Sequence, residues 1–520
     1  MYWLSYLIPI FVFLCTVGVV ITCLVFVGGA VLPDLYLMHT ALYSITQAII
    51  SALLSVLLGA ICACILNRYS FFKGRIFQSF LYLPIVFPVL AAVMGLLTIW
   101  GRDGIIYTYI SSLFDMEIKI FGTIGIILTN ILFNIPLVIK VLMSRMSNIP
   151  ASSWLLAYSL GFSRIEEWKH VEYPAIRGAL IQIFILICLF CLANFSVVIL
   201  IGDGFRSSTL EVVTYNSFLM DFRPRYGMSA SLLQIILCII VSICIFILQG
   251  TRQLANMTTC EEYSFHDRNN VYWLIIIPIC ILTIFVFLPV LVFVKEGISG
   301  ILNLSMWHID TLRALGNSIV IGVASGVLNL IFLLPVMVCV RNRKTGAYTR
   351  NIVSICMYTP IIISPVIIAS ALIILLNQWI DIDKWGMVIV IIINSITMLP
   401  VSFSVMLPAV NTLIDYWFPV IEFVDTSIIG RTINLYIPLL RKQLILSFGL
   451  VAGFSMSDIT VFLILGSNVY PTLPMAVYNN LSAYRYDLAF GSALLLAVVS
   501  GLVCLLIDNM GEKKRKCLSS

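Results

Sequence analysis

The segment WLLAYSLGFSRIEEWKHVEYP, residues 154–174, lies between two stretches that are almost continuously hydrophobic. Those flanking stretches are long enough to cross a membrane, whereas the segment mixes charged and apolar residues and must lie outside the bilayer. Ser152 and Ser153 are placed to cap a short helix, and Gly161 is placed to end it in the left-handed conformation. Pro174 is expected to restart the chain into the next span. The segment therefore predicts a capped loop helix between two spans.

The composition extends this conclusion to the whole chain. Of its 520 residues, 61% are hydrophobic and only 10% are charged, which excludes a water-soluble globule with a polar surface. The fold class predicted is all-α, a polytopic membrane protein with about twelve transmembrane helices. The predicted spans are 6–30, 39–66, 76–100, 123–142, 179–201, 227–249, 271–294, 314–340, 352–378, 386–407, 443–465 and 487–508.

The basic residues give the orientation of these spans. Most of the 30 Lys and Arg residues fall in segments that face the cytoplasm if both termini are cytoplasmic, as the positive-inside rule requires. The loop 154–174 is then cytoplasmic. The net charge of +6 is thus a topology signal that predicts no nucleic-acid partner, and the basic run 513–516 is expected to rest on membrane lipid. No Lys or Arg precedes Arg68, so the first span is not expected to be a cleaved signal peptide.

Neither disulfides nor a metal site is expected. Of the 14 cysteines, Cys260 and Cys517 fall in predicted cytoplasmic segments, the others fall in spans, and none falls in an outer loop. Cys188 and Cys191 share a helix face, and packing is their expected use.

The chain contains an internal repeat. Residues 1–249 match residues 271–508 at an offset close to 264; the corresponding pairs include Asn130 and Asn394, Pro136 and Pro400, Pro174 and Pro438, Asn194 and Asp458, and Gly202 and Gly466. With six spans in each half, both halves run the same way through the membrane, as two parallel repeats about an axis along its normal. The predicted domains are a first repeat 1–249, a cytoplasmic linker 250–270, a second repeat 271–508 and a basic cytoplasmic tail 509–520.

The spacing inside the loop 154–174 resembles the cytoplasmic loop motif of ABC importer permeases, E-A-A-x3-G-x9-I-x-L-P. Ala157, Gly161 and Pro174 keep the spacing, whereas Leu155 and Leu156 replace the glutamate and the first alanine. The resemblance implies a coupling helix that docks on an ATPase subunit. The candidate coupling residues of this loop are Ala157, Gly161, Glu167, Val171 and Pro174.

The equivalent loop of the second half follows the motif less closely. Leu435 and Pro438 keep its ending, but Asp425 stands at the glycine position and Gly430 comes five residues late. Asp425, Leu435 and Pro438 are the candidates for a second coupling contact. Either its helix ends differently from the first, or its docking is weaker.

The chain offers no means of using ATP itself. It contains no Gly-Lys dipeptide, so the phosphate-binding loop G-x4-G-K-[ST] is absent. The chain is therefore predicted to be a transporter subunit and not an enzyme, to bind no cofactor, and to leave ATP and magnesium to another polypeptide. The resemblance to ABC importer permeases implies that this partner is an ATPase homodimer.

Two polar residues inside predicted spans are candidates for the translocation pathway or a gate. Asp458 is a carboxylate well inside a span, and its repeat mate is Asn194, so the two are expected to approach each other near the pseudo-twofold axis. A structural hydrogen-bonded pair that joins two spans is an equally good interpretation. An acid facing a pore favours a cationic solute.

The outer loops 202–226 and 466–486 share the motif Thr-Leu-x4-Tyr-Asn and carry the candidate docking residues Arg206, Arg223, Arg225 and Arg485. Basic and aromatic residues there suit an acidic periplasmic substrate-binding protein. A belt of residues at the membrane interface is the alternative.

Beyond the loop motif, the chain resembles the fused permeases of the ferric iron and thiamine import branch. The stretches IWGRDGIIYTYI (99–110), NILFNIPLVIKVL (130–142) and TLPMAVYNNLSAYR (472–485) look most like thiamine and thiamine pyrophosphate permeases. The resemblance implies a type I importer fold, import of thiamine or thiamine pyrophosphate, a periplasmic binding protein, and a bacterial inner-membrane location. Ferric iron is the alternative substrate. A secondary transporter driven by an ion gradient and a membrane scaffold without transport are more distant alternatives.

Overall fold

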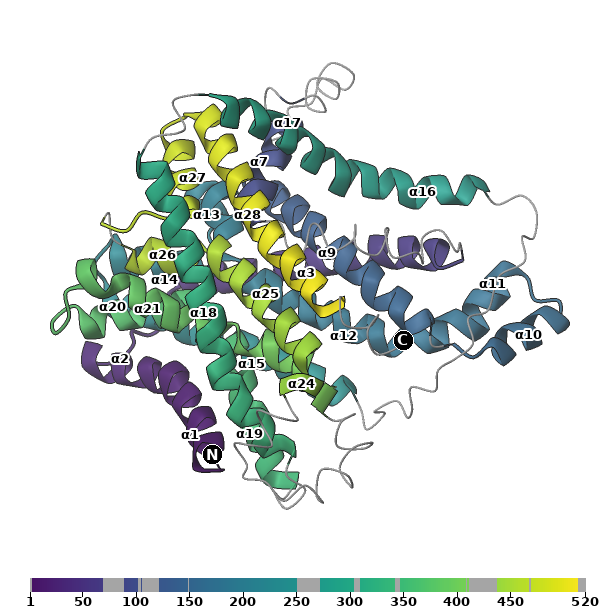
Figure 1. Ribbon diagram of the computed structural model, residues 1–520, viewed down its shortest axis with the longest axis horizontal. Coiled ribbons are helices and arrows are strands. Elements are labelled where there is room, and N and C mark those ends of the chain that lie inside the picture. The colour runs from purple at the N-terminus through teal and green to yellow at the C-terminus, as the bar shows by residue number, and fades with distance from the viewer. Residues whose placement is uncertain are drawn as a thin grey trace.

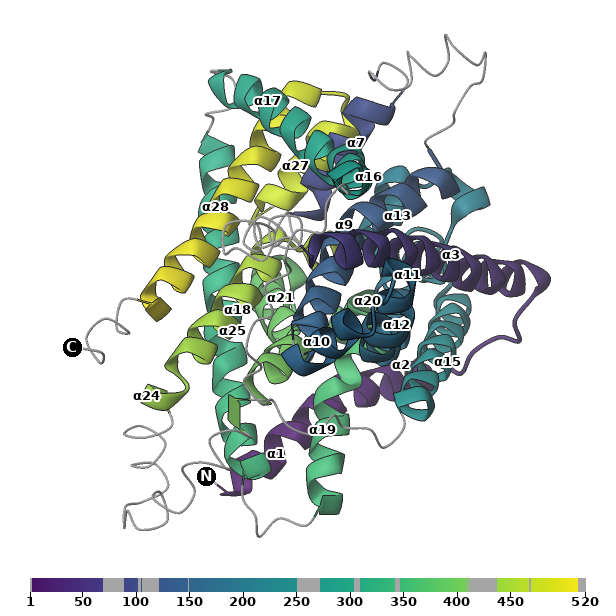
Figure 2. The same cartoon turned by 90° about the vertical axis from the view of Figure 1, so that its right-hand side faces the viewer.

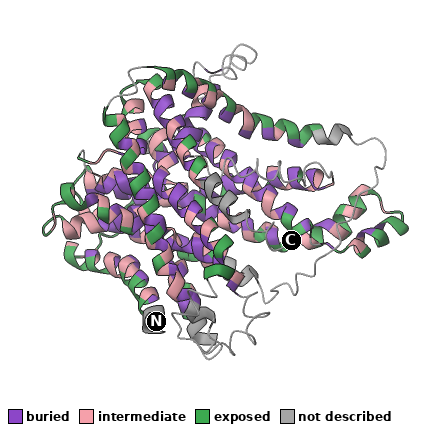
Figure 3. Cartoon of the chain, in the orientation of Figure 1, coloured by how far each residue is buried: buried purple, intermediate pink, exposed green. Residues whose placement is uncertain are grey.

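The computed structural model describes residues 2–68, 88–101, 104, 121–147, 149–249, 272–303, 309–341, 347–407, 409–410, 437–466 and 469–512. Every regular element within these ranges is helical (Figure 1). The predicted all-α class is confirmed. Long apolar helices surround a buried interior, while exposed residues concentrate on the outlying helices and loops (Figure 3).

The helices of the first half, residues 1–249, include four long ones. They are α1 (Tyr2–Phe13), α2 (Val19–Val27), α3 (Leu35–Leu66), α7 (Val89–Trp100), α9 (Thr123–Met146), α10 (Ala151–Ser159), α11 (Arg164–Glu167), α12 (Tyr173–Leu192), α13 (Phe195–Ile201), the short 3-10 helix η3 (Gly204–Ser207), α14 (Leu210–Leu219) and α15 (Pro224–Gln249). A π-helical turn, η1 (Leu14–Gly18), joins α1 to α2, and another, η2 (Trp168–Glu172), joins α11 to α12.

The second half repeats this order where it is described. Its helices are α16 (Tyr272–Leu282), α17 (Leu288–Leu302), α18 (Ile309–Arg341), α19 (Ala347–Ile362), α20 (Pro365–Leu376), α21 (Ile382–Thr397), α24 (Ile437–Leu439), α25 (Arg441–Ser457), α26 (Thr460–Leu465), α27 (Leu473–Ser482) and α28 (Tyr486–Glu512). The π-helical turn η4 (Thr283–Phe287) joins α16 to α17, as η1 joins α1 to α2.

Nine helices of the described residues are long and apolar enough to cross a membrane, or ten if the bent pair α19–α20 is one span. The predicted count of twelve therefore stays a prediction. The predicted span 443–465 is two helices, because the chain breaks at Asp458, and the span 179–201 breaks in the same way at Asn194. The bend of 84° between α19 and α20 falls just before Pro365, which cannot donate a backbone hydrogen bond.

The first helices of the two halves are exchanged. α1 packs on α18 and α19 of the second half, and α2 packs on α20. In return, α16 packs on α3 of the first half and α17 packs on α7 (Figure 2). Each half therefore supplies part of the apolar surface that covers the other.

The halves also make equivalent polar contacts. The Oγ atom of Ser44 on α3 accepts a hydrogen bond from the backbone nitrogen of Leu210, and that of Ser318 on α18 accepts one from Leu473. These contacts hold the first residue of α14 against α3 and the first residue of α27 against α18. The sequence repeat is thus accompanied by a repeat of tertiary contacts, while the domain boundaries stay predictions.

Candidate functional site

The loop helix α10 forms as the spacing predicted, although its start differs. The helix begins at Ala151, and Pro150 occupies the capping position without a side-chain hydrogen bond, so the predicted serine caps are wrong. Pro150 takes this place because proline needs no hydrogen-bond acceptor at a helix start. At the other end Gly161 has a φ of 69°. The backbone nitrogens of Phe162 and Gly161 donate to the carbonyls of Ala157 and Tyr158, at 3.1 and 3.0 Å, which is a complete Schellman motif.

One face of α10 is apolar and exposed in the described chain. Ala157 and Trp154 face inward and are buried, whereas large apolar side chains point outward. The outward side chains are Leu155, Leu156, Tyr158 and Leu160 on α10, with Ile165 on α11, and Ile165 is 78% exposed. This pair of short helices projects from the body of the molecule (Figure 1). We name the five outward side chains the loop-helix face.

Ion pairs attach this loop to the end of α3. The guanidinium of Arg68 lies 3.1 Å from the carboxylate of Glu167 and 3.0 Å from that of Glu172. Glu172 is 1% exposed, so its charge depends on Arg68 for compensation. A capping box between Ser163 and Glu166 starts α11. The loop-helix face is therefore held in a fixed orientation.

The predicted restart at Pro174 is not seen. The chain from Arg164 to Leu192 is one continuous helix, and Pro174 is the second residue of α12. The π-helical turn η2 precedes it, so the missing backbone donor of proline is accommodated by widening the helix. Val171, within η2, packs against the apolar core, whereas Pro174 is exposed.

The candidate second coupling loop is described only at its end. Asp425 and Leu435 lie outside the described residues. Pro438 lies in the one-turn helix α24 and is exposed.

The candidate gate residues occupy the two helix breaks. Asn194 precedes α13, its side-chain amide donates to the Oδ1 atom of Asn130 at 2.8 Å, and its own oxygen accepts from Val197. Asp458 precedes α26 and accepts hydrogen bonds from the backbone nitrogens of Thr460 and Val461, at 2.9 and 3.3 Å. Both side chains thus accept hydrogen bonds from backbone nitrogens in the first turn of the short helix that follows, Asn194 as the N-cap of α13 and Asp458 from one residue before Ile459, the N-cap of α26.

The two breaks meet near the pseudo-twofold axis. The hydroxyl groups of Ser196 and Thr460 are hydrogen-bonded at 3.0 Å, and these residues are 264 apart, which is the repeat offset. Two side chains that correspond by symmetry can touch only beside the axis that relates them. Asn194 and Asp458, two residues before them, flank this contact from opposite halves. A structural role in capping is established by the hydrogen bonds, and a role in the pathway stays a prediction.

The four candidate docking arginines do not share one environment. Arg206, Arg223 and Arg485 are exposed. Arg225 is exposed too, but its Nε atom donates to the carbonyl of Val27 at 3.1 Å, and its guanidinium lies against Gly28. Arg225 therefore fixes the end of α2 in addition to any docking role.

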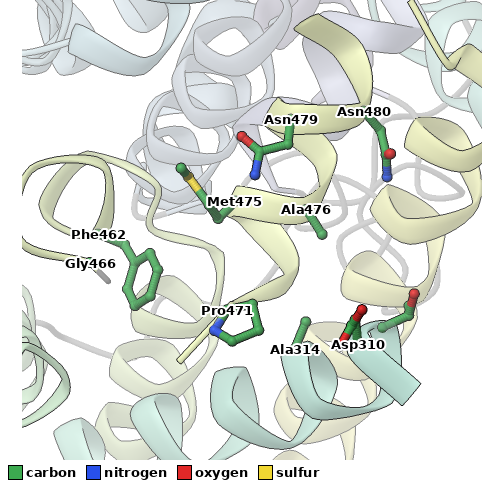
Figure 4. A pocket seen from close by; sticks show the side chains of 10 residues that line it. Asp310, Ala314, Phe462, Gly466, Pro471, Met475, Ala476, Asn479 and Asn480 are labelled. Carbon is green, nitrogen blue, oxygen red and sulfur yellow. The ribbon is translucent and has the colours of Figure 1, made fainter. Parts of the chain in front are cut away.

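A small cavity of about 260 Å³ lies between the start of α18 and the segment 466–480 of the second half (Figure 4). It is lined by Asp310 at the start of α18, by Gly466 at the end of α26, and by Asn479 and Asn480 of α27. Its volume is below the range of 300–1,000 Å³ usual for small-molecule sites. Asn479 belongs to the repeated Thr-Leu-x4-Tyr-Asn motif, which therefore helps to shape this cavity.

A buried carboxyl group was missed by the sequence reasoning. Glu211 on α14 was assigned to an exposed outer loop, yet it is fully buried, beside Ser364 and the backbone of Phe195. Neither carboxyl oxygen has a hydrogen-bond partner of good geometry. α14 lies outside the candidate spans, and burial raises the pKa of Glu211 to about 8. One signal of its special place was present in the sequence: Glu211 stands two residues after the Thr of the repeated Thr-Leu-x4-Tyr-Asn motif, where the second half has Pro474.

Within the described residues, no group of three or more His, Cys, Asp or Glu side chains could hold a metal ion.

Comparisons with known proteins agree with this architecture. Over 494 residues, 93% of this chain and 89% of the relative, the chain is 27% identical to the thiamine transport system permease protein ThiP of Brucella abortus. It is 27% identical over 486 residues to the protein of that name from Haemophilus influenzae, covering 90% of this chain and 88% of the relative. With the Escherichia coli protein it shares 25% identity over 496 residues, 93% and 90% of the two chains.

No family model and no solved structure matches the chain. The homology nevertheless spans both halves, because nine-tenths of the chain is aligned in each case. The resemblance to transport permeases drawn from the sequence is confirmed, and the chain is a multi-pass membrane protein.

Proposed function

We propose that this chain is the membrane-spanning permease subunit of an ATP-driven importer that takes up thiamine or thiamine pyrophosphate. Energy comes from a separate ATPase homodimer on the cytoplasmic side, and substrate is delivered by a periplasmic binding protein. The chain lies in a bacterial inner membrane with both termini in the cytoplasm. The full-length similarity to thiamine transport permeases supports the substrate.

The loop-helix face is the single observation that carries the ATPase contact. A monomer surface rarely leaves such a set of adjoining large apolar side chains uncovered unless another protein binds there. The bilayer does not cover it, since the surrounding loop carries Arg164, Glu166 and Lys169, which are costly in hydrocarbon. The ion pairs of Arg68 fix the face to α3, so a force applied to it is transmitted to a long helix of the permease.

Reconstitution tests the proposal. The chain, its ATPase and the thiamine-loaded binding protein are placed in vesicles, and uptake of labelled thiamine is measured with ATP, without ATP, and with ATP plus an ionophore that abolishes ion gradients. We expect uptake that requires ATP and survives the ionophore. Uptake driven by an ion gradient without the ATPase would instead make the chain a secondary transporter, with Asp458 a candidate for its coupling site. Ferric iron offered in the same assay tests the alternative substrate.

A pair of matched variants tests the docking face. Leu156→Asp places a charge on the loop-helix face, and we expect it to abolish co-purification of the ATPase. Leu32→Asp makes the same change at a side chain that is 88% exposed in the link between α2 and α3, on the side predicted to be external. Equal loss of the ATPase in both variants would show that the effect is not specific to the face.

A further inference from the structure

Two aromatic residues adopt a backbone conformation that side chains of their size avoid. Phe222 has a φ of 52° and Tyr484 a φ of 57°, and they are the only non-glycine residues of the described chain with a positive φ. For a bulky residue this conformation is an outlier that costs free energy. Strain of this kind persists where surrounding structure enforces it and is concentrated at sites of function.

The two residues lie in corresponding links of the two halves, although the repeat offset sets Phe222 opposite Arg485 or Tyr486 and not opposite Tyr484. Phe222 lies in the link between α14 and α15, and Tyr484 lies in the link between α27 and α28. An arginine follows each of them, Arg223 in one half and Arg485 in the other. Each of these two links therefore contains one strained aromatic residue followed by an arginine.

The local geometry shows that glycine would serve the backbone better. The nitrogens of Tyr484 and Arg485 donate to the carbonyls of Leu481 and Asn480, at 3.1 and 2.8 Å, which is the Schellman arrangement at the end of α27. At the end of α10 the same arrangement has Gly161 in the left-handed position. The aromatic side chain of Tyr484 is thus not required by the helix end on which it lies. The chain after α14 turns differently, since the nitrogen of Arg223 donates to the carbonyl of Ser217 at 2.8 Å.

Neither ring packs into the body of the protein. The side chain of Phe222 is 82% exposed and that of Tyr484 is 79% exposed. The contact of Tyr484 with Tyr486, at 6.3 Å between ring centres, is with another exposed ring. The strain is consequently not offset by burial within this chain.

Both rings lie away from the loop-helix face. In Figure 1, α14 and α27 lie on the opposite side of the molecule from α10 and α11. Because the loop-helix face is assigned to the cytoplasm, the two rings are on the outer side. The exposed guanidinium groups of Arg223 and Arg485 beside them favour carboxylates on whatever binds there.

We propose that Phe222 and Tyr484 are a pair of anchors that insert into two apolar pockets, each bordered by carboxylates, on the soluble protein that delivers substrate. This inference rests on the proposed function for the existence of that partner. Aromatic residues also occur at lipid interfaces, but the headgroup layer accepts a side chain in any direction and from an unstrained backbone. A fixed, strained presentation instead suits a partner with pockets at defined positions.

The two anchors differ enough to set the orientation of the partner. Tyr484 carries a hydroxyl group that Phe222 lacks, and Asp221 precedes Phe222 where Ala483 precedes Tyr484. A partner pocket that hydrogen-bonds the tyrosine leaves that group unpaired if phenylalanine is placed there. The pseudo-symmetric permease would in this way accept its partner in one of two possible orientations.

Binding of the thiamine-loaded binding protein to the full complex in nanodiscs tests the proposal. Phe222→Gly and Tyr484→Gly remove the ring while keeping the left-handed backbone, so the fold is not put at risk. We expect each to raise the Kd by about tenfold and the double variant by about a hundredfold, since independent contacts add in free energy. Basal ATP hydrolysis and ATPase co-purification should match the wild type.

Trp379→Gly is the matched control, because Trp379 is 83% exposed at the end of α20 and has an ordinary φ. Its Kd should equal that of the wild type. An unchanged Kd in the double glycine variant, or an equal loss in Trp379→Gly, would overturn the anchor assignment and leave the proposed function standing. No binding to the wild-type complex would remove the proposed function itself. A loss of complex from the membrane with an unchanged Kd would identify the rings as lipid contacts.

Discussion

Replacing Gly161 by valine tests whether the end of α10 couples ATP hydrolysis to transport. With a φ of 69°, Gly161 closes the Schellman motif, and a Cβ atom added there meets nothing within 4 Å. The substitution therefore introduces no clash, and its whole effect is on the backbone. For an L-residue the left-handed conformation costs roughly 1–2 kcal/mol, and a β-branched side chain belongs at the upper end of that range.

This cost sets the size of the expected effect. A difference of about 1–2 kcal/mol changes the ratio of two conformations by a factor of roughly 5–30. The Arg68 ion pairs still hold the start of the following helix, so we expect the valine variant to insert and to assemble with its ATPase. Thiamine taken up per ATP hydrolysed should fall by roughly fivefold to thirtyfold, because the loop-helix face is presented correctly for a smaller share of the time.

The assay is the ratio of thiamine uptake to ATP hydrolysis in vesicles, and this chain supplies matched controls. Gly204, in the loop 202–226 that is predicted to be external, has a φ of 56° and open space around it, so Gly204→Val carries the same backbone cost away from the loop helix. Gly161→Asn tests the conformation, because asparagine tolerates it. Both controls should stay within twofold of the wild-type ratio. A wild-type ratio in Gly161→Val would refute the coupling role of this helix end.

Three further substitutions address the other buried groups. Arg68→Ala should destabilise the attachment of the loop 154–174 to α3 by about 3–5 kcal/mol, as removal of one partner of a buried ion pair does. The loop should then be cut faster in limited proteolysis, and Glu172→Gln in the same chain should restore much of its resistance. Asp458→Asn should keep the thermal stability of the complex, because asparagine caps a helix as well as aspartate does, while uptake falls; unchanged uptake would reduce Asp458 to a capping residue. Because burial raises the pKa of Glu211 to about 8, its contribution to stability is present below about pH 4.5 and is lost as pH rises through 8. The melting temperature should fall less between pH 5 and 8.5 in Glu211→Gln than in the wild type. Parallel plots of melting temperature against pH for the two proteins would contradict this.

The loop helix could be predicted from sequence because its determinants are local. Gly161, placed where a short amphipathic run stops, specifies a helix end whatever the rest of the chain does, and the structure has the Schellman motif there. Hydropathy likewise predicts the long helices, since each needs only its own apolar length. The start of α10 was mispredicted because Ser152 and Pro150 compete for one position, and proline needs no partner there.

Tertiary partners could not be read from the sequence in the same way. The segment around Glu211 is polar enough to suggest an outer loop, but α14 folds back against α20 of the other half and buries the carboxyl group. Arg225 belongs to a basic segment predicted to be external, yet its Nε atom donates a hydrogen bond to the carbonyl of Val27. The sequence around Arg68 does not indicate which of the acidic residues of the loop it pairs with, because the partners are about 100 positions away.

The exchanged first helices connect the loop-helix face to the helix breaks at Asn194 and Asp458. α1 and α2 belong to the first half but pack on α18, α19 and α20 of the second, and α16 and α17 pack on α3 and α7 of the first. Arg68, which holds the loop-helix face, lies at the end of α3 and so moves with a helix that carries apolar contacts from the opposite half. We therefore expect a displacement of that face to reach both halves. The breaks at Asn194 and Asp458 lie beside the contact between Ser196 and Thr460, where the two halves meet. The breaks are also the points at which the helices have no continuous backbone hydrogen bonding to resist bending.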